Sequence, residues 1–307
     1  MIYDCIVVGG GAAGLSAALM LGRCRRRVLV CDTGEPRNRW SRAMHGYLTR
    51  DGTSPQEFLD IAREELRQYP SVECRAARVV DARQAHGGFQ VTCADGTGLR
   101  SRKLLLATGV RDDLPPIPGL PQLYGVSVHH CPYCDAWEWR DQPIAAYGRG
   151  ESGTGLALGL TLWTSDLVLC TDGRAQLDGS VRHRLARHNI EVCEERIACL
   201  EGQDGKLQRI VFQDGSAIKR LALFFATGQS QHSDLTRRLG CRFTEHGTVD
   251  TGKCESTNVA GLYVAGDASK EAQFVIVAAA EGAEAAKAIN QALLKEDLEA
   301  AEAEVLL

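Results

Sequence analysis

The segment from His129 to Asp135, His-His-Cys-Pro-Tyr-Cys-Asp, contains residues whose types and spacing suit the oxidation and reduction of sulfur. Two cysteines spaced Cys-x-x-Cys can close a small ring disulfide reversibly, and the surroundings can lower the pKa of one thiol so that a thiolate is present near neutral pH. Asp135 follows Cys134 directly and could carry the proton that moves when the thiolate leaves or returns. His130 and His129 could assist deprotonation of Cys131, or could only pack beside the pair. We therefore predict a redox-active dithiol, with the catalytic candidates Cys131, Cys134, Asp135 and His130.

A zinc site is the alternative interpretation of the same residues. Zinc would normally need a second Cys-x-x-Cys or a spaced pair of histidines, and the sequence contains no other Cys-x-x-Cys. Ligands crowded into six residues would be geometrically awkward, so we expect no metal. We interpret the ten remaining cysteines as small buried hydrophobes in a reducing cytoplasm. They are Cys5, Cys24, Cys31, Cys74, Cys93, Cys170, Cys193, Cys199, Cys241 and Cys254.

A dinucleotide-binding motif opens the chain. The β-branched strand Ile2 to Val8 leads into Gly9-Gly10-Gly11-Ala12-Ala13-Gly14, and a helical pattern over Leu15 to Leu21 follows. Glycines at this spacing allow a tight turn, close approach of backbone N–H groups to a pyrophosphate, and close contact of helix and strand. A second strand, Val28 to Cys31, ends at Asp32, where an acid can hold a ribose hydroxyl pair.

Further segments are expected to contact the same dinucleotide. A buried strand closes on Ala107-Thr108-Gly109, where small residues let the backbone approach a ligand. The acid of Gly266-Asp267 can bind the ribityl or pyrophosphate region of a flavin, and the helix from about Gln273 to Leu294 points its N-terminus at the flavin ring. His45 lies in a polar loop and could face the flavin or substrate, or only the solvent. The complete set of candidates for this first site is Gly9, Gly11, Ala12, Ala13, Gly14, Asp32, Thr33, Arg37, Asn38, His45, Ala107, Thr108, Gly109, Gly266, Asp267, Gln273 and Phe274.

The glycine spacing repeats in the middle of the chain. A strand, Ile144 to Tyr147, meets Gly148-Arg149-Gly150-Glu151-Ser152-Gly153 and a helix, and the strand Leu167 to Cys170 follows at the right distance. A site that selects NADPH needs arginines for the 2'-phosphate. After this strand only Arg174 is available, and Asp172 would repel the phosphate. The candidates for the second site are Gly148, Gly150, Glu151, Ser152, Gly153, Thr171 and Asp172.

Composition limits the class of protein. The 307 residues are 44% hydrophobic and 24% charged, with a net charge of -4, which gives no reason to expect a nucleic-acid partner. No apolar run approaches the roughly 20 residues that span a bilayer. The chain opens directly into a strand without a secretion signal, so we expect a cytoplasmic protein with no transmembrane segment.

Breaks in the pattern give the domain organisation. The segment Leu114-Pro115-Pro116-Ile117-Pro118-Gly119 interrupts all regular structure, and Gln229 to His232 provides a return crossing. The predicted fold is α/β, with two Rossmann-like, three-layer ββα nucleotide-binding domains, the second inserted into the first. The first domain comprises residues 1–114 and 233–307, and the inserted domain comprises residues 115–232.

The chain resembles the low-molecular-weight thioredoxin reductase family over essentially all 307 positions. The resemblance implies FAD in the outer, discontinuous domain and the redox cysteines in the inserted one. It also implies that Cys134 contacts the flavin, that Cys131 exchanges with a thiol or disulfide substrate, and that Asp135 handles the proton. Such enzymes are usually homodimers whose inserted domain swings. The motifs that carry the resemblance, in the family's order, are Gly9-x-Gly11-x-x-Gly14, Ala107-Thr108-Gly109, Cys131 to Asp135 and Gly266-Asp267.

Three departures point to a side branch of that family. The pair is Cys-Pro-Tyr-Cys where the family typically has Cys-Ala-Thr-Cys, and Thr171-Asp172-Gly173 replaces the double arginine of the NADPH segment. The loop from His45 to Gly52, Trp137-Glu138 and the segment from Gln273 to Gly282 resemble dithiol oxidases and diflavin-linked disulfide oxidoreductases. In those relatives electrons run from dithiol to flavin, and in the diflavin enzymes a second FAD takes the place of NADPH.

Three functions follow as hypotheses. The first is an FAD-dependent thiol-disulfide oxidoreductase that does not use NADPH, with NADH or a second FAD in the second site. Its substrate would be a thiol or disulfide on a small molecule or a thioredoxin-like protein. The second is an NADPH-dependent thioredoxin reductase whose phosphate contact comes from Arg149 or Arg174. The third is a non-catalytic flavin redox sensor.

Overall fold

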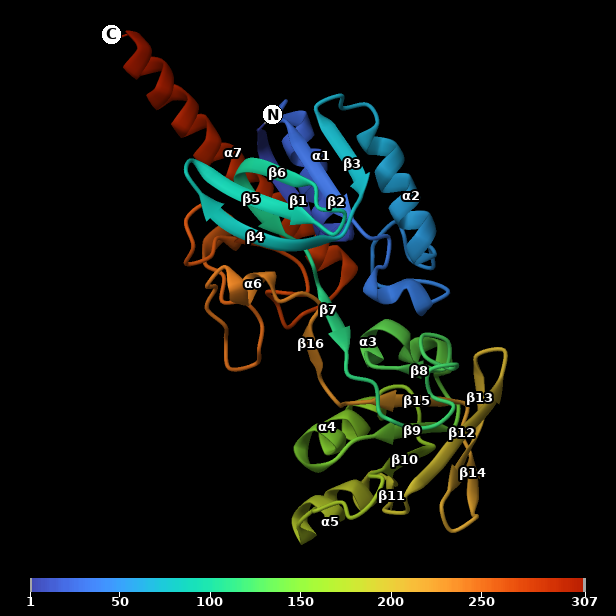
Figure 1. The fold of residues 1–307 in the computed structure, drawn as a ribbon. Coiled ribbons are helices and arrows are strands. Elements are labelled where there is room, and N and C mark those ends of the chain that lie inside the picture. Colours follow the sequence, from blue (N-terminus) through green and yellow to red (C-terminus); the bar gives the residue numbers. More distant parts are fainter. Residues whose placement is uncertain (1, 306–307) are drawn as a thin grey trace. The chain divides into compact units, whose positions relative to one another are not determined.

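A computed structural model describes residues 2–305, and the chain divides into two compact units (Figure 1). Unit 1 comprises Met1–Arg37, Gln56–Arg111 and Ser230–Leu307, and unit 2 comprises Asn38–Pro55 and Asp112–Gln229. The chain crosses between the units along β7 (Val110–Asp112) and β16 (Gln229–Gln231), which pair with each other. Among the described residues, no helix combines the length and apolar character that crossing a bilayer requires.

Unit 1 is built on a sheet with the strand order β3-β2-β1-β6-β5-β4, and β17 pairs with β6. The C-terminal half of β6 runs parallel to β1 and β17, whereas its N-terminal half pairs antiparallel with β5. A parallel nucleotide-binding sheet therefore continues into an antiparallel meander. The elements of this unit are β1 (Tyr3–Val8), α1 (Ala12–Arg23), β2 (Val28–Asp32), α2 (Pro55–Leu66), β3 (Val72–Ala76), β4 (Val79–Ala85), β5 (Gly88–Cys93), β6 (Gly98–Leu106), α6 (Leu235–Arg238), η3 (Lys253–Glu255), β17 (Leu262–Val264) and α7 (Val275–Val305); η1 (Arg37–Trp40) spans the boundary between the units.

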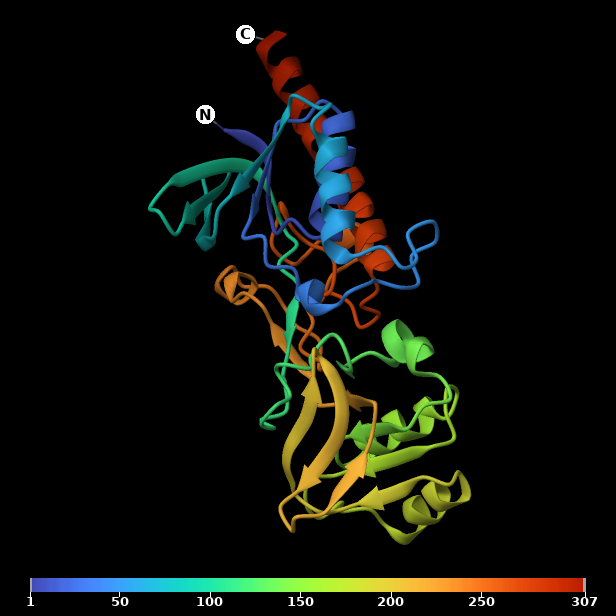
Figure 2. The ribbon, with the colours of Figure 1, turned by 90° about the vertical axis from the view of Figure 1, so that its right-hand side faces the viewer.

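Side chains alternate between the two faces of the parallel strands, and both faces are buried. In β1, Cys5 and Val7 pack towards α1, α2 and α7, and Ile6 and Val8 pack on the side of the meander. Figure 2 shows these helices on one side of the sheet and the meander on the other. Strands buried on both faces read as near-continuous apolar runs, which explains the pattern Ile-Val-Val at the start of the chain.

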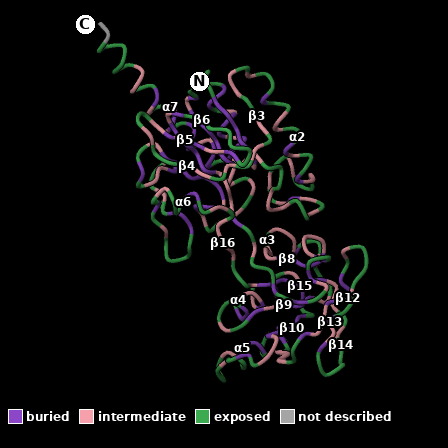
Figure 3. Tube along the Cα trace, viewed as in Figure 1, coloured by how far each residue is buried: buried purple, intermediate pink, exposed green. Residues whose placement is uncertain are grey.

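Unit 2 repeats the three layers. Its parallel sheet has the order β11-β10-β9-β15-β8, with α4 and α5 on one face and the antiparallel sheet β12-β13-β14 on the other. The central strands of each sheet, β1 in unit 1 and β9, β10 and β15 in unit 2, are buried along most of their length (Figure 3). The elements are β8 (Val128–His129), α3 (Pro132–Asp135), η2 (Ala136–Trp139), β9 (Ile144–Tyr147), α4 (Gly150–Leu160), β10 (Leu167–Cys170), α5 (Gly179–Arg187), β11 (Glu191–Cys193), β12 (Ile197–Gln203), β13 (Lys206–Phe212), β14 (Ala217–Lys219) and β15 (Ala222–Phe225).

The predicted α/β class with two Rossmann-like sheets is confirmed. The last helix is longer than the expected range, because α7 continues past Leu294 through the Glu-rich tail to Val305. Alanine and glutamate favour the helix, and basic side chains of unit 1 pair with acids near its end: Arg26 and Arg102 lie 2.5 Å and 2.7 Å from the carboxylate of Asp297. These ion pairs hold the part of α7 beyond Leu294 against unit 1.

The segment 38–55 groups with unit 2, which the sequence pattern did not predict. The backbone of Trp40 lies so close to Gly125 that a Cβ at residue 125 would be 2.6 Å from it. The guanidinium of Arg42 donates to the carbonyl of Asp204 at 3.1 Å. These contacts join segments far apart in the chain, and no local pattern reports them.

Replacing Gly282 with Ala should destabilise unit 1. Helices α1 and α7 pack through small residues, and a Cβ at residue 282 would lie 2.0 Å from the Ala13 carbonyl oxygen. Overpacking of this kind should lower the free energy of unfolding by about 2 kcal/mol or more. Urea denaturation followed by circular dichroism measures the change.

The matched control is Gly155→Ala, inside α4, where a new Cβ meets nothing within 4 Å. It should raise stability by about 0.5–1 kcal/mol, because alanine restricts the unfolded chain. Equal effects of the two substitutions would contradict the proposed close contact of α1 and α7.

Candidate active site

Cys131 and Cys134 form a disulfide, with a Cα–Cα distance of 5.3 Å. Cys131 is the N-cap residue of the single-turn helix α3, and Pro132 occupies its first position, where a proline is tolerated because no N–H is needed. The N–H groups of Cys134 and Asp135 donate to the Cys131 carbonyl at 3.2 Å and 3.3 Å. One helical turn brings residues three apart onto the same face, so the local fold itself closes the ring. This arrangement favours the redox interpretation over zinc.

Asp135 is held by a buried histidine. His129, whose side chain is only 4% exposed, places its Nδ1 3.4 Å from Oδ1 of Asp135. On the opposite side of the ring, the indole N–H of Trp139 donates to Nε2 at 3.1 Å. An indole N–H is only a donor, so Nε2 must be an acceptor. Nε2 of His129 is therefore engaged by Trp139, and Nδ1 is the ring nitrogen that lies beside the Asp135 carboxylate.

His130, the histidine predicted as catalytic, lies in a different set of contacts. Its Nδ1 is 3.4 Å from the Tyr124 hydroxyl and 3.7 Å from Oδ2 of Asp112. Tyr124 also donates to Asp112, whose side chain is 5% exposed. The structure thus brings His129 to the acid beside the cysteines and ties His130 to the segment before β8. Of the two histidines, only His130 was predicted to be catalytic.

The surface beside the disulfide is aromatic. Tyr133, between the two cysteines, is 73% exposed, and its ring meets Trp163 edge-on at 5.9 Å. Trp137 is 63% exposed and stacks under the guanidinium of Arg140. Exposed aromatic side chains that flank a reactive group commonly form a contact surface for a partner or substrate.

Two of the predicted flavin-site residues, Asn38 and His45, belong to unit 2. His45 lies between acids, with Nδ1 3.4 Å from Asp51 and Nε2 3.6 Å from Glu138. Glu138 belongs to η2, directly after the redox segment. His45 therefore connects the 38–55 loop to the redox segment within unit 2.

The first glycine turn is built for close backbone approach. A Cβ on Gly14 would lie 1.9 Å from the Gly9 carbonyl oxygen, whereas a Cβ on Gly11 would meet nothing within 4 Å. Helix α1 begins at Ala12 with Gly11 as its N-cap residue and with no side-chain cap. The first-turn N–H groups, including those of Ala13 and Gly14, therefore have no side-chain cap, as an anion-binding helix start requires.

Asp32 ends β2 and faces this turn. Its carboxylate accepts the Gly10 N–H at 3.0 Å and lies 3.1 Å from the Arg63 guanidinium. Thr33, the next residue, is exposed. The acid therefore lies at the carboxyl end of β2 beside the glycine turn, where the dinucleotide motif requires it.

Thr108 supplies an independent sign of a ligand. Ala107 continues the sheet by donating its N–H to Val8 at 2.8 Å, and a Cβ on Gly9 would collide with the Ala107 carbonyl. The Thr108 hydroxyl oxygen is buried and has no hydrogen-bond partner among the described residues. Buried polar atoms are nearly always paired, and a bound cofactor would supply the missing partner. Gly109 follows with a positive φ of 66°.

Asp267 and Gln273 converge on Arg37, and Gly266 directly precedes Asp267. The Arg37 guanidinium contacts the Asp267 carboxylate at 2.8 Å and the Gln273 side-chain oxygen at 2.6 Å. Phe274 is 37% exposed just before α7, and its carbonyl accepts the Ala278 N–H. Four of the predicted flavin-site residues thus lie together at the carboxyl end of β17 and the start of α7.

Glu281 was not predicted as a site residue. Its carboxylate accepts the Gly266 N–H at 2.7 Å, and only 6% of the residue is exposed. Burial is the main cause that raises the pKa of Glu281 to about 7, and repulsion from Glu255 also raises it. The Gly266 N–H and the charge of Lys270 act in the opposite direction. A carboxylate on an otherwise apolar helix face is the signal that could have identified this residue.

The second glycine turn repeats the first. A Cβ on Gly153 would lie 2.4 Å from the backbone of Gly148, whereas Gly150 borders open space, and α4 also begins without a side-chain cap. Glu151 and Ser152 occupy the first turn of α4. The two β-α turns therefore offer the same kind of uncapped helix start.

The loop after β10 is occupied by internal contacts. Oδ1 of Asp172 accepts the Ile197 N–H at 2.9 Å. The guanidinium of Arg149 donates to the carbonyls of Thr171, at 2.7 Å, and Asp172. Its distance to Oδ2 of Asp172 is 3.9 Å. Arg149 therefore folds against this loop, which sequence reasoning had not foreseen.

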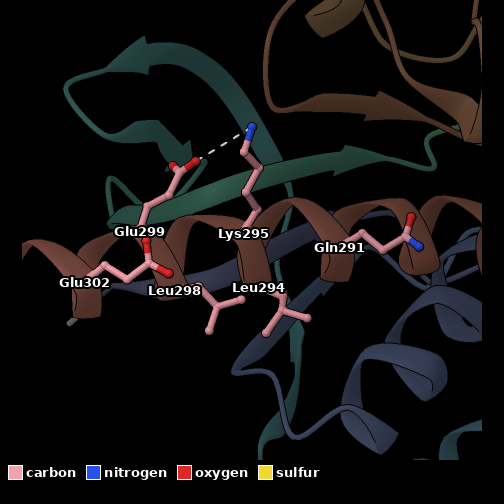
Figure 4. A pocket seen from close by; sticks show the side chains of 6 residues that line it. All are labelled: Gln291, Leu294, Lys295, Leu298, Glu299 and Glu302. Atoms are coloured by element: carbon pink, nitrogen blue, oxygen red, sulfur yellow. Dashed lines mark ion pairs between the residues drawn. The ribbon is translucent and has the colours of Figure 1, made fainter.

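A surface pocket along α7 is lined by Gln291, Leu294, Lys295, Leu298, Glu299 and Glu302 (Figure 4), none of which was a predicted site residue. Within residues 2–305, no cluster of three or more His, Cys, Asp or Glu side chains is arranged to hold a metal ion.

Known proteins share this architecture. The family model of pyridine nucleotide-disulphide oxidoreductases matches residues 3–282. The chain is 31% identical over 301 residues to a probable thioredoxin reductase of Arthroderma benhamiae, covering 88% of this chain and 74% of that protein. The crystal structure of a putative thioredoxin reductase, TrxB, from Bacillus anthracis has 35% identity and a TM-score of 0.92, covering 96% of this chain and 99% of that one. The crystal structure of HlmI has 33% identity and a TM-score of 0.94, covering 99% and 96%.

Glu281 should make stability depend on pH. Its pKa in the folded chain, about 7, lies above its usual value of 4.5. Between these values the folded state binds more protons than the unfolded state, so the free energy of unfolding falls as the pH rises from about 4.5 to 7. Glu281→Gln keeps an acceptor for the Gly266 N–H. In this variant the fall in the free energy of unfolding with rising pH should be smaller by an amount on the order of 2 kcal/mol.

Urea unfolding at several pH values between 5 and 8 measures this effect. Glu284→Gln, at an exposed position of the same helix, is the control and should keep the wild-type pH dependence. An unchanged pH dependence in Glu281→Gln would show that another group is responsible.

Proposed function

The chain belongs to the pyridine nucleotide-disulphide oxidoreductase family and is a thioredoxin reductase-like flavin disulfide oxidoreductase; from this premise we propose that it passes two electrons between the Cys131–Cys134 disulfide and FAD without NADPH as donor. The observation that carries the proposal is the closed disulfide beside Asp135, whose carboxylate lies 3.4 Å from a His129 ring that Trp139 holds in place. We propose a thiol or disulfide as the substrate.

Unit 1 is the proposed FAD-binding domain, and the residues present fit that cofactor. The uncapped start of α1 would face the pyrophosphate, and Asp32 would face a ribose. The buried hydroxyl of Thr108 and the Arg37–Asp267 pair would contact the rest of the cofactor. When bound, FAD supplies a two-electron acceptor or donor for the dithiol.

The sulfur chemistry follows from the positions of the two cysteines. A thiolate of a substrate dithiol attacks the sulfur of Cys131, the bond to Cys134 breaks, and Cys134 leaves as a thiolate. The second thiol of the substrate then attacks the substrate sulfur that is bonded to Cys131. A substrate disulfide forms, and Cys131 is released. The substrate loses two electrons and the Cys131–Cys134 pair gains them; the reverse sequence reduces a disulfide substrate.

Asp135 would accept and return the proton that these steps move. Nδ1 of His129 lies 3.4 Å from the Asp135 carboxylate, and the hydrogen bond from Trp139 to Nε2 restrains rotation of the ring. His129 is therefore a positioning residue, which keeps the carboxylate in one orientation beside the cysteines.

The second site favours a dinucleotide without a 2'-phosphate. The Asp172 carboxylate lies at the carboxyl end of β10, and two nitrogens of Arg149 are engaged by carbonyls. The Arg149–Asp172 ion pair is weak, because the two groups are 3.9 Å apart and Arg149 is 59% exposed. The negative charge of Asp172 would therefore still repel a 2'-phosphate. NADH or a second FAD is the ligand we propose for this site.

An NADPH-dependent thioredoxin reductase is the second candidate. The printed names of relatives, such as the probable thioredoxin reductase of Arthroderma benhamiae, favour it. Arg149 and the exposed Arg174 flank the same loop and could turn towards a phosphate. A thioredoxin-like protein would then be the partner. A third candidate, a non-catalytic flavin redox sensor, is favoured by no specific contact.

We also propose a homodimer in the cytoplasm. Leu294 and Leu298 of α7 are 49% and 55% exposed and offer apolar surface to a second copy. The described cysteines other than Cys131 and Cys134 are free thiols, as expected in a reducing compartment. Light scattering of the purified protein tests the dimer.

Replacing Cys134 with Ser should stop electron transfer from dithiols to the flavin. Dithiothreitol added without oxygen should bleach the flavin absorbance of the wild type. In Cys134→Ser the rate should fall by at least about 100-fold, because no disulfide is present to accept the electrons. Cys199→Ser, a half-buried free cysteine of the same unit, is the control and should react like the wild type. Normal bleaching in Cys134→Ser would refute the proposal.

Asp172→Asn should shift nucleotide preference towards NADPH. The amide oxygen can still accept the Ile197 N–H, but the negative charge is lost. Relative to NADH, NADPH should gain roughly tenfold in affinity, about 1.4 kcal/mol. Stopped-flow reduction of the flavin by each nucleotide measures the preference, and the ratio of flavin to protein separates NADH from a second FAD. Rapid reduction of the wild-type flavin by NADPH would support the second candidate instead.

A further inference from the structure

Cys170 and Cys193 lie side by side in unit 2. They are partners in the parallel register of β10 and β11, the last residue of each strand. Residues paired across a sheet project to the same face, and both side chains pack into the same apolar cluster, with Val168 and Phe225 among its members. The sequence treated both cysteines as isolated buried hydrophobes, whereas the fold makes them a pair.

The two thiols have unequal surroundings. Cys170 is completely buried, whereas Cys193 is partly exposed on β11, an edge strand. A hydrogen bond with the Cys170 thiol lowers the pKa of Cys193 to about 7, and burial opposes this effect. The same hydrogen bond and burial raise the pKa of Cys170 well above its usual value. One thiol is therefore accessible and readily ionised, and its partner is protected and protonated.

We propose that Cys170 and Cys193 form a second redox-active dithiol, which small-molecule disulfides oxidise to a disulfide with Cys193 as the attacking sulfur. The Cys193 thiolate attacks one sulfur of the small disulfide, forms a mixed disulfide and releases one thiolate. Cys170 then attacks the sulfur of Cys193, and the second small thiolate leaves with the proton of Cys170. In sum, two protein thiols lose two electrons, and one small disulfide becomes two small thiols.

The strand geometry permits this bond. Neighbouring strands lie about 4.8 Å apart, within the Cα separation of about 4.4–6.8 Å that disulfides span. Closure therefore needs rotation of two side chains and little movement of the backbone.

The pair also supports the loop of the second dinucleotide site. The Cys193 carbonyl accepts the N–H of Thr171 at 3.0 Å and its hydroxyl at 3.3 Å, and the Cys170 carbonyl accepts the Gly148 N–H at 3.2 Å. Oxidation would therefore alter the affinity of that site for a dinucleotide. This consequence rests on the proposed function, whereas the disulfide itself does not.

Peptide mapping tests the disulfide directly. The full-length flavoprotein is reduced, freed of reductant, incubated with oxidised glutathione, blocked with an alkylating agent and digested with trypsin. A cross-link between peptides 150–174 and 188–196, which contain Cys170 and Cys193, is the expected product. Cys170→Ser should instead hold glutathione on Cys193, and Cys193→Ser should leave Cys170 unmodified. Absence of the wild-type cross-link, or glutathione retained on wild-type Cys193, would overturn the proposal.

A second thiol pair in the same chain is the internal control. Cys31 and Cys93 also share a hydrogen bond, but both are buried and their strands, β2 and β5, are not neighbours. They should stay reduced. A Cys170–Cys193 link that forms only together with a Cys31–Cys93 link would report unfolding and would overturn the proposal.

Binding of NADH to the oxidised and reduced forms measures the effect on the second site. We expect the Kd to change at least threefold in the wild type and to stay constant in Cys193→Ser. A cross-link without any change in Kd would refute the coupling to the second site. That outcome would contradict neither the Cys170–Cys193 disulfide nor the proposed flavin chemistry of Cys131 and Cys134.

Discussion

Close contact between the first and last glycines of each β-α turn is the constraint on which both units depend. A Cβ at Gly14 or Gly153 would enter the backbone of the turn that precedes the helix. Because the helix lies this close to its strand, its first N–H groups point to the carboxyl edge of the parallel sheet. No side chain caps them, so each turn presents hydrogen-bond donors that a phosphate can accept. The acids after β2 and β10 then lie beside those donors.

The parts of this structure that sequence could predict are the local ones. Glycine spacing and β-branched runs report on neighbours in the chain, and the expected strands Ile2 to Val8, Val28 to Cys31, Ile144 to Tyr147 and Leu167 to Cys170 correspond to β1, β2, β9 and β10. Contacts between distant segments have no local pattern. Whether His129 or His130 faces Asp135 depends on which way β8 turns each ring, and the Glu281–Gly266 bond depends on the packing of α7. The grouping of residues 38–55 with unit 2 has the same origin.

The two acids beside the glycine turns illustrate how one motif can serve different ends. Asp32 uses its carboxylate to hold its own glycine turn through the Gly10 N–H, with Arg63 on the other oxygen. Asp172 instead accepts the Ile197 N–H, so its carboxylate joins β10 to the antiparallel sheet of unit 2. Asp172 adopts a positive φ of 50°, a conformation that aspartate tolerates better than most residues. Its identity therefore has a structural reason as well as an electrostatic one.

The three cysteine pairs also differ in how the fold brings them together and in whether solvent reaches them. Reactivity of a thiol pair requires that the two sulfurs can meet and that one of them is accessible and ionised. The Cys131–Cys134 pair meets the first requirement through one helical turn. Cys170 and Cys193 meet it through strand register, and Cys193 meets the second through its position on an edge strand. Cys31 and Cys93 share a hydrogen bond, but both are buried, so neither thiol is accessible to a substrate. Spacing along the chain reveals only the first pair, because strand register and burial are set by the whole sheet.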